Sequence, residues 1–376
     1  MFFKKHSNKE EIFCEYLNDT EKTATKDVEK SVITRMQSVY GGKRALRDTH
    51  VKTHACIDAN LEIFNFDEQE IKSCLIENFN IHPDQLAPVN IKEGILKTPR
   101  SFPAILRFAN GTTRAQSDKA LDARSMSVKL YDVIGDHLKE AYSTREQDII
   151  VQNAPVFFVR GIADYHSFFK AARGKGWRIL PWLLFHPYQA VSLYKTIRRK
   201  PISLMTETYW SGSAYALGDV IDSLNSGTNQ KMRYPLVVKY GFFPTSPNAP
   251  FEKLEPVMRP KQVSDNYYRD DIIQRLKPKN SHYYWDFSIQ IQTHPKHSVD
   301  DVTIEWPETE APFFRVGRLS VSSQKILAKD QFETGESLRF SPWNGLKVHR
   351  PVGELNRLRG NIYPIVANIR QKALSR

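Results

Sequence analysis

The stretch RGNIYP, residues 359–364, together with Arg370 carries the most information about this 376-residue chain. On a helix, positions i, i+4 and i+11 fall on one face, so Arg359 and Arg370 would flank Tyr363. An opposite charge within about 4–6 Å favours the ionised form of an acidic group and can lower its pKa by roughly 1–3 units. A phenolate has few uses in proteins, and ligation of ferric haem is the best known. The spacing therefore predicts either a tyrosinate ligand for haem or an ordinary solvated basic helix.

Five further segments precede this stretch: RDTHVK at 47–52, PAILRF at 103–108, DARSMSVKLY at 122–131, DIIVQNAPVFFVR at 148–160 and FSPWN at 340–344. Together with RGNIYP they resemble the motifs of the catalase superfamily in order and spacing, from about residue 44 to the C-terminus. Several positions depart from that family, and two of them lie on the predicted strands. Ser125 stands where glycine is usual, and Ala109 stands where a serine commonly follows Arg-Phe. Several matched segments in one order make the resemblance specific.

The resemblance implies an α+β fold, namely an eight-stranded antiparallel β-barrel with helical additions and a C-terminal proximal helix that contacts haem b. In this family a tyrosinate binds the ferric iron, so Tyr363 is the implied metal ligand and Arg359 the implied partner of its charge. Arg47, Arg107 and Arg370 are implied to hold the haem propionates. Arginine suits that role because its contacts with carboxylates are bidentate and permanently charged.

On the distal side the resemblance implies a histidine that takes a proton from peroxide and returns it, a task that suits a pKa near 6.5. His50 matches the family position because Arg47 precedes it by three residues and Lys52 follows it by two, and His54 is the local rival. Thr49 stands where true catalases usually carry valine, and resembles the allene oxide synthase branch, which rearranges fatty-acid hydroperoxides. We expect the Thr49 hydroxyl to hydrogen-bond the His50 ring and to weaken its action on hydrogen peroxide.

The segment 148–160 is implied to supply the rest of the distal wall. Counted back from Pro155 without a gap, Gln152 takes the place of the family's distal asparagine, and Asn153 comes one residue late. A one-residue slip on a strand turns a side chain to the other face. Either a bulge restores Asn153, which the Asn-x-Pro sequence favours, or the site uses Gln152. The aromatic residues expected to line this wall are Phe157, Phe158 and Tyr165.

Hydrophobic periodicity suggests the same architecture independently. Residues 1–40 are polar with apolar positions at helical spacing, which predicts an N-terminal arm over the body or a partner subunit, followed by one haem-binding domain at 41–376. Helical periodicity covers 154–172, and alternation predicts a half-buried strand at 283–293. Numerous antiparallel strands with interspersed helices favour a closed barrel. The predicted strands are 60–66, 104–109, 125–133, 148–151, 235–243, 283–293 and 313–321.

Composition narrows the classes of partner. The chain has 54 Lys plus Arg against 42 Asp plus Glu, a net charge of +12, but the basic residues are scattered without a nucleic-acid-binding motif, so we expect no nucleic acid partner. Three cysteines without a C-x-x-C spacing, and a start without an apolar leader, predict a cytoplasmic protein. The densest apolar segment, 177–187, is expected to be a buried kinked helix, a lip over an apolar channel, or a peripheral contact with anionic lipid.

These observations predict a haem-b enzyme that activates peroxides, with organic or fatty-acid hydroperoxides favoured over hydrogen peroxide. The chain either acts as a monomer or forms a homo-oligomer. A small true catalase is the first alternative. A non-enzymatic protein that binds haem or lipid is the second.

Overall fold

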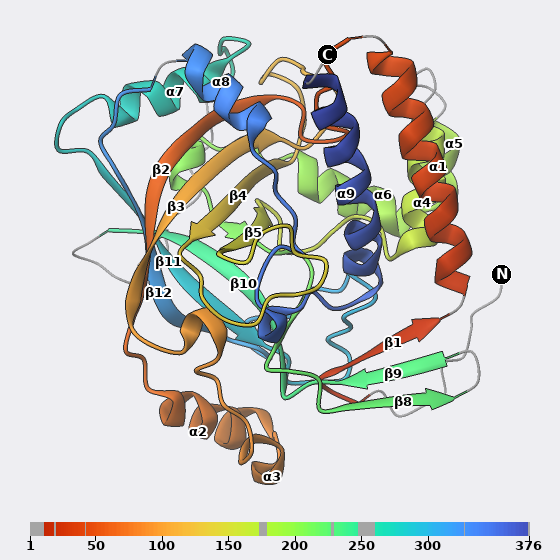
Figure 1. Ribbon diagram of the computed structural model, residues 1–376, viewed down its shortest axis with the longest axis vertical. Helices are drawn as coiled ribbons and strands as arrows, with labels where there is room; N and C mark the ends of the chain where they lie inside the picture. The colour runs from red at the N-terminus through yellow and green to blue at the C-terminus, as the bar shows by residue number, and fades with distance from the viewer. Residues whose placement is uncertain are drawn as a thin grey trace.

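The computed structural model describes residues 11–18, 20–41, 43–172, 179–226, 229–246, 260–326 and 328–374. Its centre is a closed antiparallel barrel of eight strands (Figure 1). Each strand pairs with the next, and the last pairs with the first, so the predicted eight-stranded barrel is confirmed. In order around the barrel the strands are β2 (Thr53–Ile63), β3 (Arg100–Asn110), β4 (Arg124–Tyr131), β5 (Glu146–Gln152), β6 (Tyr209–Trp210), β10 (Leu236–Thr245), β11 (His282–Ile291) and β12 (Phe313–Ser322).

Two details of the predicted elements were wrong. The helix expected from residue 154 begins only at Ile162, as α4 (Ile162–Ala172), since proline disfavours helical geometry in the residue before it and Pro155 lies at the expected start. The strand β11 is buried on both faces from Trp285 onward rather than on one. Its polar residues have partners: Asp286 pairs with Arg315 at 2.8 Å, and Gln290 donates to two backbone carbonyls.

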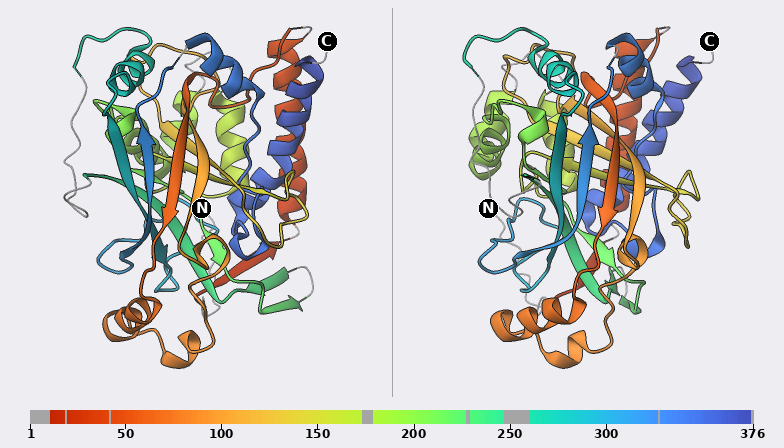
Figure 2. Two further views of the ribbon diagram at one scale, coloured as in Figure 1. Left: turned by 60° about the vertical axis from the view of Figure 1, so that its left-hand side comes forward. Right: turned by 90° about the vertical axis from the view of Figure 1, so that its left-hand side faces the viewer.

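Short elements surround the barrel (Figures 1 and 2). A small sheet of β1 (Cys14–Asn18), β9 (Asn229–Arg233) and β8 (Asp222–Ser226) lies below α9 (Glu354–Leu374), and β7 (Tyr215–Leu217) pairs with β10. The other helices are α1 (Thr20–Tyr40), α2 (Glu68–Phe79), α3 (Pro83–Leu86), α5 (Ile179–Phe185), α6 (Pro187–Ile197), α7 (Tyr267–Leu276) and α8 (Ala328–Ser337), with 3-10 turns at Gly94–Leu96, Leu204–Thr206 and Lys347–His349. None of the described helices has the length and apolar character needed to cross a bilayer.

The N-terminal part of the chain packs over the proximal helix. Val28, Val32 and Met36 of α1 are buried in one cluster with Leu358 and Ile362 of α9, and the two helices lie side by side in Figures 1 and 2. Residues 1–10 of the predicted arm lie outside the described residues. The division of the chain into an arm and one domain stays a prediction.

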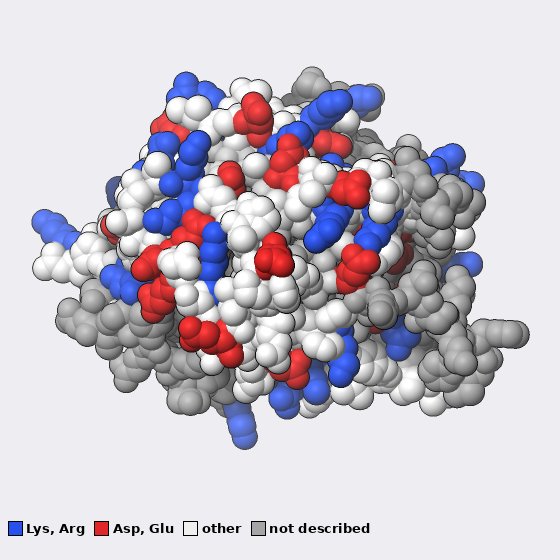
Figure 3. All heavy atoms as spheres, turned by 90° about the horizontal axis from the view of Figure 1, so that it is seen from below, with Lys and Arg blue, Asp and Glu red and all other residues white. Residues whose placement is uncertain are grey.

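Among the described residues, charges of both signs are mixed at the lower end of the molecule. Viewed from below, lysine and arginine side chains are interspersed with aspartate and glutamate (Figure 3). Such a mixed surface offers no long-range attraction for a polyanion on this face.

Candidate functional site

The proximal helix α9 is fixed by the FSPWN segment that precedes it. Trp343 donates from Nε1 to the Asn356 carbonyl at 2.6 Å. A side chain at position 360 would place its Cβ 2.9 Å from that same Nε1, so Gly360 lets the helix approach the indole closely. This packing sets the rotation of α9, which turns Ile362, Tyr363, Val366, Ala367 and Arg370 toward one pocket.

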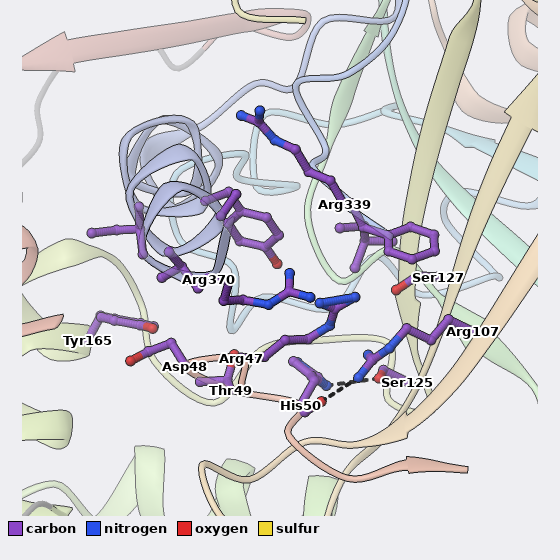
Figure 4. A pocket seen from close by; sticks show the side chains of 16 residues that line it. Arg47, Asp48, Thr49, His50, Arg107, Ser125, Ser127, Tyr165, Arg339 and Arg370 are labelled. Atoms are coloured by element: carbon purple, nitrogen blue, oxygen red, sulfur yellow. Dashed lines mark hydrogen bonds between the residues drawn. The ribbon is translucent and has the colours of Figure 1, made fainter. Parts of the chain in front are cut away.

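That pocket lies between α9 and the wall of the barrel (Figure 4). The empty space of the pocket, part of it open to solvent, amounts to about 720 Å³. The lining residues other than those of α9 are Arg47, Asp48, Thr49, His50, Arg107, Ser125, Ser127, Ile150, Tyr165, Arg339 and Phe340.

Arginines from different elements point into this pocket, and Figure 4 shows Arg47, Arg107 and Arg370 converging there. The Nε atoms of Arg107, Arg339 and Arg370 are buried without a hydrogen-bond partner. Burial, followed by the repulsion of Arg47, lowers the pKa of Arg107 to about 9 and that of Arg370 to about 10. A group carrying negative charge would relieve both the unpaired donors and the repulsion.

One carboxylate of the protein already lies among these arginines. Glu336 of α8 is buried, with oxygens 3.9 Å from Arg107 and 3.7 Å from Arg370. Arg47 donates to the carbonyls of Gly335 and Leu338 at 2.7 and 2.8 Å. The lining also holds a fourth arginine, Arg339, and a second carboxylate, Asp48, which is paired with Arg35. The arginines of the pocket therefore outnumber the carboxylates set among them, and the propionates of a haem would offset this excess of positive charge. The residues present fit a cofactor that carries carboxylates.

His50 enters the pocket from the loop before β2, in a left-handed backbone conformation with φ of 56°. Its carbonyl accepts a hydrogen bond from Arg107 at 2.7 Å, which anchors this conformation. Desolvation in the pocket, and then the charge of Arg107, lowers the pKa of the His50 ring to about 3. The ring is therefore uncharged at neutral pH and able to accept a proton.

The hydroxyl group that contacts the His50 ring belongs to Ser125, and not to Thr49 as we expected. Ser125 Oγ lies 2.9 Å from His50 Nδ1 and 3.2 Å from the Ala109 carbonyl, to which it donates (Figure 4). A serine has one hydroxyl proton. If that proton points to Ala109, the serine oxygen accepts from Nδ1–H, and Nε2 keeps its lone pair. Thr49 lines the pocket without this contact, so the predicted Thr49–His50 hydrogen bond was wrong.

The two sequence departures at 109 and 125 belong together, because Ala109 and Ser125 lie directly opposite each other on β3 and β4. We expect Ser125→Ala to lower peroxide turnover by roughly tenfold, since a neutral hydrogen bond contributes about 0.5–1.5 kcal/mol. The double variant Ala109→Ser/Ser125→Gly should recover most of that loss. Nitrogen NMR of the ring in the haem-free protein should show Nδ1 protonated in the wild type and mixed tautomers in Ser125→Ala. Equal spectra in both would contradict the positioning role.

His54 lies outside the pocket, in a buried polar network of the barrel. Its Nε2 is 2.7 Å from Asn110 Oδ1, and its Nδ1 is 3.8 Å from Asp118. Lys52 donates to the same Asp118 at 2.8 Å. The structure therefore brings His50, and not its rival, into contact with the space where a cofactor would lie.

Neither amide expected on the distal wall lines the pocket. No bulge interrupts the pairing of β4 with β5, so Gln152 lies opposite Ser125 and Asn153 points the other way. Asn153 is buried and accepts from the Arg124 backbone N–H at 2.8 Å, which makes the expected bulge wrong. Gln152 stands on the pocket side of the sheet, but its amide turns away and donates to the Val156 carbonyl at 2.9 Å.

The predicted aromatic residues divide between the pocket and the core. Tyr165 of α4 lines the pocket. Phe157 and Phe158 stack on each other at 5.0 Å and pack into a neighbouring aromatic cluster instead, so their placement in the lining was wrong. The backbone explains this, because the Phe157 N–H donates to the Val302 carbonyl at 2.9 Å and turns the chain away.

Arg359 lies next to the pocket rather than in its lining. Its Nη1 donates to Ser213 Oγ at 2.9 Å and to Asn356 Oδ1 at 3.2 Å, and its guanidinium lies 5.6 Å from the centre of the Phe157 ring. These contacts hold the cation on the first turns of α9, four residues before Tyr363. The stabilisation of a Tyr363 phenolate by Arg359 stays a prediction.

Sequence reasoning missed several residues of the site. Asp48 lines the pocket and forms an ion pair with Arg35 of α1, which ties the His50 loop to the N-terminal helix. Glu336 carried no signal because its arginine partners are remote in sequence. Ser125 did carry a signal in the sequence, because it replaces the usual glycine of the family. Its partner across the strands, Ala109, replaces the usual serine.

The comparisons with known proteins agree with this fold. No family model matches the chain. Catalase T of Saccharomyces cerevisiae, from strains YJM789 and ATCC 204508 / S288c, is 22% identical over 259 residues, which cover 64% of this chain and 42% of the yeast protein. The match thus spans less than half the length of these curated relatives.

Solved catalases have a similar structure over most of the chain. A fungal catalase superposes with a TM-score of 0.62 at 16% identity and covers 90% of this chain and 62% of its own. Catalase A from Saccharomyces cerevisiae gives 0.60 at 16%, covering 91% and 64%, and a bacterial catalase gives 0.57 at 15%, covering 91% and 60%. The barrel, the order of the motifs and the sequence relatives together support a protein of the catalase superfamily.

Proposed function

We propose that the protein is a haem-b enzyme that acts on peroxides, with organic or fatty-acid hydroperoxides as its preferred substrates. The observation that carries the proposal is the pocket itself, into which Tyr363 of α9, the uncharged ring of His50 and a group of arginines all project. A phenol, a neutral base and excess positive charge are the three parts that a tyrosinate-ligated haem needs.

The chain's residues would divide the work around the cofactor. The Tyr363 oxygen would ligate the iron as phenolate, and Arg47, Arg107 and Arg370 would bind the propionates. Bound haem would supply the ferric iron that exchanges electrons with the peroxide. His50 would take a proton at Nε2 from the incoming peroxide and return it to the departing oxygen, while Ser125 holds the ring at Nδ1.

The preference for bulkier hydroperoxides rests on Thr49, which lines the pocket where true catalases usually carry valine. In this position the chain resembles the allene oxide synthase branch, which rearranges fatty-acid hydroperoxides. The aliphatic residues Ile362, Val366 and Ala367 of α9 would contact the haem that Tyr363 ligates, rather than the substrate.

A small true catalase is the second candidate. One observation favours it: the His50 ring contacts Ser125 rather than Thr49, which removes the hydrogen bond that we expected to weaken hydrogen peroxide chemistry.

One experiment separates the two. The purified protein, loaded with haem and normalised to haem content, is assayed for oxygen evolution from hydrogen peroxide and for consumption of a fatty-acid hydroperoxide. The proposal expects rapid consumption of the lipid substrate with little oxygen. Rapid oxygen evolution with no lipid turnover would establish the catalase instead. Haem binding without turnover of either peroxide would contradict both.

A further inference from the structure

The helix α6 has its amphipathic character reversed. Its buried face carries Gln189, Ser192 and Thr196, whereas Tyr188, Val191 and Tyr194 are 51%, 54% and 57% exposed. The buried polar groups are satisfied: Gln189 donates to Asp164 at 2.9 Å, and Thr196 donates to the Ser192 carbonyl at 2.9 Å. Since α6 packs against the body through these polar residues and Leu193, the side chains of Tyr188, Val191 and Tyr194 are left for another contact.

The preceding helix α5 extends this surface. Leu180, Leu184 and Phe185 are 62%, 76% and 79% exposed, while Trp182 of the same helix is buried. We call these three residues, with Tyr188, Val191 and Tyr194, the α5–α6 patch. Most of the large apolar side chains that the described chain exposes elsewhere stand singly. A grouped set of this kind marks an interaction surface rather than ordinary exposure.

The charge of the chain segment that carries the patch is of one sign. Between Asp164 and Glu207 the sequence holds eight lysines and arginines and no acidic residue. Among the described ones, Lys195 and Arg198 are exposed at the end of α6, and the Arg198 guanidinium lies 5.9 Å from the centre of the Tyr194 ring. Apolar and aromatic side chains beside exposed cations match the boundary between acyl chains and anionic headgroups.

We propose that the α5–α6 patch seats the protein on a bilayer that contains anionic lipid. Leu184 and Phe185 enter the acyl boundary, the two tyrosines lie at headgroup depth, and Lys195 and Arg198 contact the lipid phosphates. Charge complementarity selects this occupant, because a second copy would bring the same cations against each other. This membrane contact is proposed independently of the peroxide chemistry. The patch and the pocket are nevertheless neighbours in the fold, because α4 packs against α5 and also carries Tyr165, which lines the pocket.

The haem-loaded protein is tested by flotation with vesicles of phosphatidylcholine alone and of phosphatidylcholine with roughly a third phosphatidylglycerol. We expect binding to the anionic vesicles only, and a decrease as salt is raised. The double variant Leu184→Glu/Phe185→Glu should lose at least about tenfold of this binding. Ile134→Glu is the matched control, since Ile134 is 74% exposed far from the patch in sequence, and it should bind like the wild type.

Two further measurements make the outcome decisive. The charge variant Lys195→Glu/Arg198→Glu should also lose binding to anionic vesicles, and circular dichroism and haem content should be unchanged in all variants. Wild-type protein that ignores anionic vesicles, or a Leu184→Glu/Phe185→Glu variant that floats like the wild type, would overturn the proposal. Sedimentation distinguishes the other occupant: if the same double variant turns a wild-type dimer into a monomer without any vesicle binding, the patch joins two copies of the chain.

Discussion

Replacement of Tyr363 by phenylalanine should abolish haem binding or shift the Soret band of the bound haem strongly. The protein should still fold. The phenol oxygen is the atom that the proposal makes the iron ligand, and phenylalanine removes only that atom from the pocket lining. The structural cost should be small, because the ring keeps its place on α9. The measurement is the ultraviolet–visible spectrum after reconstitution with an equal amount of haem, together with circular dichroism.

Tyr165→Phe is the matched control for this experiment. It deletes a phenol oxygen from the same pocket, on α4 instead of α9, and should leave the Soret band and haem content as in the wild type. A Tyr363→Phe protein with the wild-type spectrum would show that the iron has another ligand. Loss of haem in both variants would indicate a general effect on the pocket rather than ligation.

The sequence predicted those parts of the site whose positions depend on local periodicity. Tyr363 and Arg370 reach one pocket because positions seven apart on a helix share a face, and Arg107 and His50 reach it because their flanking residues kept the family spacing. Six of the barrel strands were marked by local sequence patterns within about four residues of the observed bounds, whereas β2 begins seven residues before the predicted start and β6 was not predicted. The number of strands came from the family resemblance. Local patterns were sufficient for the marked strands and the helix face because the backbone geometry repeats.

The parts that failed depended on contacts between remote segments. Whether Gln152 or Asn153 faced the pocket was decided by the register of β4 with β5. The predicted hydrogen bond from Thr49 to His50 was wrong because Ser125, which lies on β4, occupies the position beside the ring nitrogen Nδ1. Glu336 could not be assigned at all, since nothing in its neighbourhood indicates that it will meet Arg107 and Arg370. Such side-chain choices are set by packing in three dimensions and leave no periodic trace in the sequence.

Replacement of His50 by alanine should lower peroxide turnover on the order of 10²–10⁴-fold while haem remains bound, because loss of a positioned acid–base group has that effect. His54→Gln is the control, since His54 is a buried histidine that lies behind the pocket in the Asn110–Asp118 network. It should change turnover little once haem content is normalised. The reverse ranking would show that the base is His54, or that proton transfer uses a group we have not identified.

The pH dependence gives a second, independent test of His50. A histidine with the ordinary pKa near 6.5 would be only about 3% unprotonated at pH 5, and a base in that state would be almost inactive. Desolvation and the charge of Arg107 lower the pKa of His50 to about 3, so the ring stays neutral in the folded enzyme at pH 5. We therefore expect turnover to fall less than about twofold between pH 7 and pH 5.

The same low pKa has an opposite consequence for stability, which the assay must separate. An unfolded chain binds a proton at His50 as the pH falls below 6.5, whereas the folded protein does not until about pH 3, so stability decreases through that window. His54, whose pKa is also lowered to about 3 by burial, adds to the same loss. Initial rates with the haem spectrum recorded at each pH distinguish unfolding from loss of the base. A decline in turnover that is centred near pH 6.5 while the spectrum stays native would mean that the catalytic histidine titrates normally, and therefore that it is not the desolvated ring of His50.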